Sequence, residues 1–212
     1  ENAYNTKNYT EALNNFDKAI ILMPSNHMFY TMRGNVYEDM GDTESAETDY
    51  RKSLEIESDN YLAAYRLGML YFSKKDFKNA IKWLKISNNK SDGLDGLEKS
   101  LGITKQNLMF VSKKVIVGNL GNFLTQVGQF EEGIKYLDEA IKLDPNYINP
   151  YMTKGMAYAQ MGQPRKGIPF LQKALQLGHH PAEMAINFLE NLAMEQLKKQ
   201  NDQKEATEIK YA

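Results

Sequence analysis

The feature that most constrains this chain is a period of 34 residues. Small residues recur at that spacing in two separate parts of the sequence. The recurring pairs are Gly34 and Gly68, Ala46 and Ala80, Gly121 and Gly155, and Gly133 and Gly167. A fixed period of this length indicates one supersecondary unit that is stacked several times. The sequence therefore predicts an elongated array in which each unit contacts mainly its neighbours.

Each unit combines small and large residues at fixed positions, which we number from 1 at His27. Small residues occupy positions 8, 20 and 27, and large apolar residues occupy positions 11 and 24. Within each half of the unit, these positions follow the spacing of one helical face. Gly41, Gly128 and Gly162 fall at position 15 and indicate a turn between the halves. Each unit is therefore predicted to be two antiparallel helices that approach closely at their small residues.

The segment from Gly128 to Asn146 resembles the second half of the tetratricopeptide repeat. The same pattern fits five units: a truncated one within 1–26, then 27–60, 61–94, 114–147 and 148–181. The resemblance implies an all-α fold, a right-handed α-solenoid of tandem helix–turn–helix repeats with about ten to thirteen helices. It implies a single array over residues 1–200 that ends in a capping helix, 182–200, and is followed by a polar tail, 201–212.

The first unit is incomplete in this sequence. We expect only the end of its first helix, up to about Thr6, followed by a second helix from Thr10 to Met23. We infer that the chain is part of a longer protein, in which an upstream helix covers Leu13 and Phe16. A face that bears these two residues and Ile20 also supports an alternative, self-association through the truncated repeat.

At the other end, the predicted capping helix opens at Pro181. Met184, Phe188, Leu189 and Leu192 give it one apolar face, which we expect to cover the last repeat.

The period fails once, after the third unit. The next unit begins at Lys114 instead of Asp95, so residues 95–113 form an insertion. Its Asp-Gly pairs predict turns, and Thr104 is placed to cap a helix that continues through Val111 into the fourth repeat. The insertion is either a tolerated loop between repeats or a specific contact surface.

Composition excludes several kinds of function. Lys and Arg number 26 against 27 Asp and Glu, so a net charge of −1 gives no field to attract nucleic acid or an anionic membrane. The sequence has no cysteine, which excludes disulfides and thiolate chemistry. That absence favours the cytoplasm without excluding a bacterial periplasm. No apolar run is long enough for a transmembrane segment, and no signal peptide is visible.

No catalytic or metal-binding pattern accompanies the repeats. The sequence has no Gly-rich phosphate loop, no nucleophile elbow and no zinc-type pair. Its three histidines are His27, His179 and His180, and the last two fall in a turn without further ligands nearby in sequence. We therefore expect no enzyme activity, no cofactor and no metal.

The resemblance instead points to a binding surface. In this family the first helices of successive repeats line a concave groove, with positions 2, 5, 9, 12 and 13 facing it. We expect the principal contacts to a peptide or partner protein at positions 5 and 9. These residues are Asn35, Tyr65, Met69, Asn122, Met152 and Met156. Tyr and Met supply apolar anchor area, and the amides orient a peptide backbone.

One subgroup of the family binds the C-terminal carboxylates of chaperones through lysines and asparagines at set positions. Counted from residue 27, this chain offers Thr31, Asn35, Arg66, Val115 and Asn119 at those positions. The two lysines that fix a carboxylate are missing, so the sequence does not predict a chaperone-tail site. Two functions remain. The first is a protein-interaction scaffold, and the alternative is the regulatory or substrate-docking domain of a longer enzyme or signalling protein.

Overall fold

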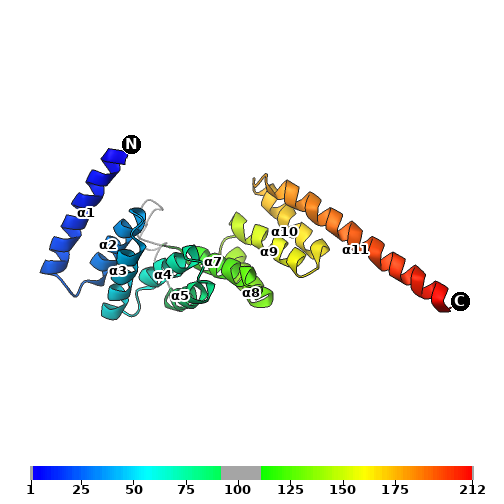
Figure 1. Cartoon of the computed structure of the whole chain (residues 1–212), viewed down its shortest axis with the longest axis horizontal. Helices are drawn as coiled ribbons and strands as arrows, with labels where there is room; N and C mark the ends of the chain where they lie inside the picture. The colour runs from blue at the N-terminus through cyan, green and yellow to red at the C-terminus, as the bar shows by residue number, and fades with distance from the viewer. Residues whose placement is uncertain (1, 92–110, 212) are drawn as a thin grey trace. The chain divides into compact units, whose positions relative to one another are not determined.

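Every regular element in the described residues, 2–91 and 111–211, is an α-helix, as the computed structural model in Figure 1 shows. The ten helices found there are α1 (Asn2–Leu22), α2 (His27–Asp39), α3 (Thr43–Ile56), α4 (Tyr61–Ser73), α5 (Phe77–Lys90), α7 (Lys113–Gln126), α8 (Phe130–Leu143), α9 (Ile148–Gln160), α10 (Pro164–Gln176) and α11 (Ala182–Tyr211). The prediction of an all-α fold built from helix pairs is confirmed.

The helices belong to two compact units, Glu1–Phe123 and Leu124–Ala212, and α7 crosses the boundary between them. In the first unit α2 pairs with α3 and α4 with α5, and in the second α9 pairs with α10. The helices α2, α4 and α9 begin at the first position of their repeats. The grouping of both units into one array remains a prediction.

The helices of the first unit begin at side-chain caps. Asn26, Asp42, Asn60 and Asp76 precede α2, α3, α4 and α5, and each accepts a hydrogen bond from a backbone N–H of the first turn. For example, the N–H of Ser45 donates to Oδ1 of Asp42 over 3.1 Å. These caps satisfy donors that the helix itself leaves unpaired, which fixes where each helix starts.

The turns inside the repeats depend on left-handed backbone. Gly41, Gly128 and Gly162 have φ of 81°, 79° and 73°, and Lys75 occupies the same position of its repeat with φ of 60°. A side chain disfavours this conformation, so glycine is the expected residue there and Lys75 is the exception.

The two helices of a repeat touch where a glycine faces a large side chain. A Cβ atom added to Gly34 would lie 2.7 Å from Cε1 of Tyr50, and one added to Gly155 would lie 2.6 Å from Cδ2 of Leu171. Tyr50 and Leu171 are fully buried. Position 8 therefore packs directly against position 24 of the partner helix, which explains why glycine recurs there.

A buried polar cluster joins the 27–60 repeat to the helix that follows it. Asn60 Nδ2 donates to Oγ1 of Thr31 over 2.8 Å and to Oγ of Ser53 over 2.7 Å, while its Oδ1 caps α4. Oγ of Ser53 donates in turn to the carbonyl of His27. Because these groups satisfy one another out of water, the cluster fixes α4 against α2 and α3.

The structure corrects the prediction for the N-terminal end. A turn was expected between Thr6 and Thr10, but α1 is one continuous helix. The physical reason is length: a remnant of about six residues is too short to form a stable separate helix, so the backbone extends α1. Leu13, Phe16 and Ile20 are half-buried, and α1 contacts α2. Self-association through this helix remains a prediction.

The capping helix packs through a face that includes Leu189, as predicted, but is rotated away from Met184 and Phe188. Ile186 and Leu189 are buried against Leu171 of α10, but Met184 and Phe188 are 74% and 56% exposed. The buried positions of α11 are Ala182, Ile186, Leu189 and Ala193. They follow a strict helical spacing, and the two alanines permit close approach, whereas Met184 and Phe188 lie on the opposite side. The helix runs on to Tyr211, through the segment expected to be a tail.

Residues 92–110, which include most of the 95–113 insertion, lie outside the described residues, as does the predicted cap at Thr104. Val111 and Ser112 are not helical, and α7 begins at Lys113. The prediction of one helix that runs without a break through Val111 into the fourth repeat is therefore wrong.

We expect Gly34→Ala to lower the free energy of unfolding by about 1–3 kcal/mol, because the buried Tyr50 ring leaves no room for the added methyl group. Alanine has the better intrinsic helix propensity, by about 1 kcal/mol, so only packing explains a loss. Chemical denaturation measures this difference. A variant as stable as the wild type would show that position 8 does not face position 24.

Lys75→Gly should raise the free energy of unfolding by about 1 kcal/mol, since it removes the cost of a left-handed lysine in an exposed turn. Lys78→Gly on the neighbouring helix α5 is the control, and it should destabilise by about the same amount. Thermal unfolding of the two variants measures whether each of them is more or less stable than the wild type. Loss of stability in both would mean that the turn does not need glycine.

Candidate functional site

The predicted contact residues of the first unit lie on α2, α4 and α7. We call the surface formed by Asn35, Glu38, Tyr65, Arg66, Met69, Asn119 and Asn122 the first-helix face. Glu38 of α2 and Arg66 of α4 approach each other across it, with Oε2 and Nη1 4.0 Å apart. The structure thus places Asn35, Tyr65, Met69 and Asn122 on three helices that carry the first halves of their repeats.

Tyr50 positions the α2 side of this face from behind. Its ring is buried between α2 and α3, while its hydroxyl lies 2.9 Å from Oδ1 of Asn35 and 2.6 Å from Oε2 of Glu38. Burial raises the pKa of Tyr50 well above its ordinary value, and the hydrogen bond to Glu38 raises it further. The hydroxyl therefore stays protonated and holds both acceptors in place.

Asn119 links α7 to α4 on the same face. Its Nδ2 donates to the hydroxyl of Tyr65 over 3.0 Å and lies 3.5 Å from Sδ of Met69. Between the same two helices, the rings of Phe72 and Phe123 stack with centroids 3.9 Å apart. Despite the insertion in the sequence, α7 thus lies beside α4, as the next first helix of an array would.

The anchors of the first unit differ in exposure. Tyr65 is only 8% exposed, whereas Met69, Asn35 and Asn122 are half-buried. Removing Tyr65 is therefore expected to affect stability as well as binding.

The predicted residues of the second unit lie on α9. Met152 and Met156 are half-buried, and both pack against the cluster of Leu171, Ile186 and Leu189. Their methionine side chains therefore help to seat α11 as well as reaching the surface. These methionines belong to the second unit, whereas Asn35 and Tyr65 belong to the first.

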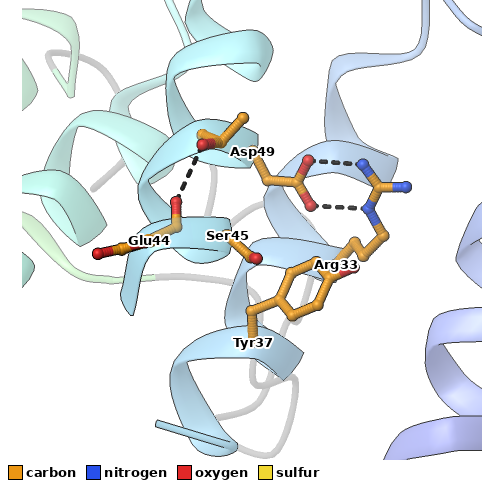
Figure 2. A pocket seen from close by; sticks show the side chains of 6 residues that line it. Arg33, Tyr37, Glu44, Ser45 and Asp49 are labelled. Atoms are coloured by element: carbon orange, nitrogen blue, oxygen red, sulfur yellow. Dashed lines mark hydrogen bonds and ion pairs between the residues drawn. The ribbon is translucent and has the colours of Figure 1, made fainter. Parts of the chain in front are cut away.

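A pocket of about 360 Å³ opens between α2 and α3, and none of the predicted contact residues lines it. Figure 2 shows its side chains. Arg33 spans it and donates from Nε and Nη2 to the buried carboxylate of Asp49, each over 2.7 Å. Nη1 donates to Asp17 of α1. The bonds to Asp49 raise the pKa of Arg33 above its ordinary value. The guanidinium of Arg33 is paired with the carboxylates of Asp49 and Asp17. This ion-pair cluster therefore has a structural role and links α1, α2 and α3.

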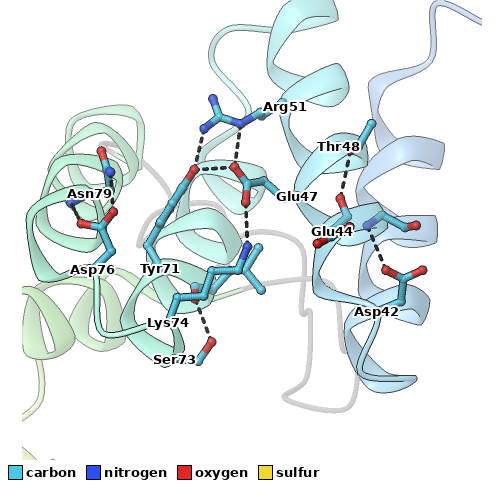
Figure 3. A network of polar contacts seen from close by, with 12 residues as sticks. Asp42, Glu44, Glu47, Thr48, Arg51, Tyr71, Ser73, Lys74, Asp76 and Asn79 are labelled. Carbon is cyan, nitrogen blue, oxygen red and sulfur yellow. Dashed lines mark hydrogen bonds and ion pairs between the residues drawn. The ribbon is translucent and has the colours of Figure 1, made fainter.

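A second polar network joins α3 to α4 at the surface (Figure 3). Glu47 accepts hydrogen bonds from Tyr71, from Nε of Arg51 over 3.1 Å and from Nζ of Lys74 over 2.9 Å. Burial opposes ionisation of Glu47, but these bonds outweigh it and lower its pKa to about 2. Arg51 also lies over the rings of Tyr71 and Trp83. Glu47 therefore serves as an acceptor that ties neighbouring repeats together.

The described part of the chain contains no group of three His, Asp or Glu side chains that could hold a metal ion. None of its helices combines the length and the hydrophobicity needed to span a bilayer.

Sequence reasoning missed two residues of the first-helix face. Asn119 and Arg66 were considered only for a chaperone-tail site, and neither was predicted as a contact. Their partners are far away in the sequence: Tyr65 lies 54 residues from Asn119. No periodic pattern signals such a contact.

Comparison with known proteins agrees with this geometry. Sequence profiles described as tetratricopeptide repeat match residues 31–87 and 148–177, and one described as TPR repeat matches 121–162. Hsp70-Hsp90 organizing protein 1 of Glycine max is 24% identical over 193 residues, which cover 82% of this chain and 34% of that protein. A TPR repeat-containing protein of Methanocaldococcus jannaschii is 25% identical over 189 residues, covering 88% and 30%.

Among solved structures, that of MamA superposes with a TM-score of 0.67 at 19% identity, over 84% of this chain and 93% of that one. At this identity the likeness concerns the fold. The chain spans about a third of the length of the curated relatives it matches.

We expect Glu47→Gln to destabilise the protein by about 1–2 kcal/mol at neutral pH, because it weakens three charge-assisted hydrogen bonds. The folded-state pKa lies below the unfolded one, so the ionised carboxylate stabilises the fold above the ordinary pKa of glutamate. That stability is lost as the pH falls from about 4.5 towards about 2. Urea denaturation at several pH values should show the two proteins converging there; a gap that is independent of pH would contradict the assignment.

Proposed function

Because the chain belongs to the tetratricopeptide repeat family, we propose that it is a protein-interaction scaffold that holds a peptide segment of a partner protein on its first-helix face. One observation supports this most. Asn35, Tyr65 and Met69 occupy positions 5 and 9 of successive repeats, and contacts through Glu38, Arg66 and Asn119 join their helices side by side.

The chemistry of the face suits an extended or helical peptide. Met69 and Tyr65 provide apolar and aromatic surface that accepts varied side chains. Asn35 and Asn122 provide amide groups, which pair with backbone N–H and C=O groups of a ligand. In the second unit Met152 and Met156 offer further apolar contacts. The proposal assigns the chain no catalytic role.

The relatives are consistent with a scaffold. The name of the Glycine max protein describes it as organising Hsp70 and Hsp90. We carry over only the general role, bringing proteins together, because the two lysines of the chaperone-tail site are missing from their positions in this chain.

Substitutions on the face should weaken binding of peptides selected from a random library displayed on phage. We expect Tyr65→Ala and Asn122→Ala each to weaken peptide binding by about 1–3 kcal/mol, since they remove an anchor and an orienting amide. Isothermal titration calorimetry with the synthetic peptides measures the change. Tyr65→Phe, which keeps the ring, is the matched control and should retain most of the affinity.

Because Tyr65 is buried, its variants should be compared at a temperature where circular dichroism shows each of them folded. The competing site is the insertion, tested by deleting residues 95–104. If both point variants bind normally and the deletion abolishes binding without unfolding the protein, the proposed site is wrong and the insertion is the binding site.

A further inference from the structure

Arg66 is an arginine on the first-helix face whose side chain forms no hydrogen bond with any of the described residues. The other two arginines of the first unit are tightly bound. Arg33 makes three contacts of 2.7 Å to carboxylates, and Arg51 makes contacts of 3.1 Å and 2.6 Å to Glu47 and Tyr71. Arg66 has one ion pair, to Glu38, and at 4.0 Å that pair is too long for a hydrogen bond.

The guanidinium of Arg66 also carries a donor without an acceptor. Its Nε is buried, and none of the described residues accepts a hydrogen bond from it. A buried donor without an acceptor destabilises the unliganded chain, and native structures rarely retain one without a reason. The side chain as a whole is 30% exposed, so its outer nitrogens reach the surface. A small rotation towards a ligand oxygen would give Nε the acceptor that it lacks.

The carboxylate of Glu38, beside Arg66, is held in place by one hydrogen bond and can accept another. Its Oε2 accepts from Tyr50 over 2.6 Å, and no described residue donates to its Oε1. Asp39, the next residue of α2, is exposed. The face therefore offers a guanidinium donor next to a carboxylate acceptor, with a second carboxylate close by.

This charge balance indicates the class of ligand. An acidic group placed on Arg66 would meet two carboxylates for one guanidinium, and a basic group placed on Glu38 would meet Arg66. A neutral amide carries an acceptor C=O and a donor N–H side by side, so it can pair with both residues at once and adds no charge.

We propose that Arg66 and Glu38 form a subsite that binds a neutral amide group of the partner segment, with Arg66 donating to its carbonyl oxygen and Glu38 accepting from its N–H. The subsite rests on the proposed function, because it lies on the first-helix face. The amide comes either from the backbone of an extended segment or from a Gln or Asn side chain. Arg66 is thereby the residue that selects against charged groups at this point of the face.

The test uses the full chain and peptides selected by the wild type from a random library on phage, resynthesised with acetylated N-termini and amidated C-termini. Arg66→Gln should weaken their binding by about tenfold or more, the effect of losing a hydrogen bond from a charged group. Lys78→Gln removes the same charge from an exposed site on α5 and should change affinity by less than about twofold. Arg66→Gln should leave the melting temperature unchanged or raise it, since the Arg66 side chain forms no hydrogen bond with the described residues.

Chemical changes to the peptide distinguish the two possible sources of the amide. Replacing Gln or Asn of the peptide by Leu abolishes the Arg66 dependence if a side chain is bound, whereas methylating single backbone nitrogens abolishes it if the backbone is bound. Recovered peptides dominated by Asp and Glu, with affinity that falls steeply with salt, would overturn the proposal in favour of a carboxylate ligand.

The outcomes also distinguish this inference from the proposed function. Peptides that bind Arg66→Gln as tightly as the wild type but lose affinity with Asn122→Ala would refute the amide subsite alone. Peptides whose binding is insensitive to both variants and to Tyr65→Ala would refute the first-helix face, and the subsite with it.

Discussion

The fold depends on the contact between a glycine of one helix and a large side chain of its partner. At Gly34 and at Gly155 there is no space for even one additional carbon atom, because Tyr50 and Leu171 fill it. The same contact recurs between Gly68 and Leu84. Since the helices are this close, the buried side chains around them pack into clusters, such as Ala46, Tyr50, Ala63 and Leu67 in the first unit.

Tyr50 connects this packing to the candidate site. Its ring is the large partner of Gly34, and its hydroxyl emerges between Asn35 and Glu38 on the first-helix face. A core residue thereby fixes the orientation of two surface side chains before any ligand arrives. Such preorganisation lowers the entropic cost of binding. It also means that the stability of the repeat and the geometry of the face cannot be varied independently at this residue.

Charged residues at position 7 connect successive repeats in both units. Arg33 binds Asp17 of the preceding second helix and Asp49 of its own repeat. Lys154 makes the corresponding ion pair with Asp138 and lies 4.2 Å from the ring centroid of Phe170, where the other repeat has Asp49. Both cations are largely buried, and partners surround both of them, so they stabilise the repeat contacts rather than offering free charge to a ligand. Arg66, which lacks such partners, differs from them for this reason.

The sequence by itself determined the helix pairs, their register and their turns. These features depend on local rules: the spacing of small and large residues on a helical face, the capping side chains such as Asp42, and the left-handed backbone at Gly41 and its equivalents. Tertiary structure alone decided that α11 turns Ile186 and not Phe188 towards the last repeat, and that Asn119 reaches Tyr65. It also decided that the buried Nε of Arg66 finds no acceptor among the described residues, although Glu38 lies nearby. The physical reason is that these outcomes depend on side chains brought together from distant helices. A 34-residue period does not indicate which exposed or apolar positions will contact a neighbouring helix.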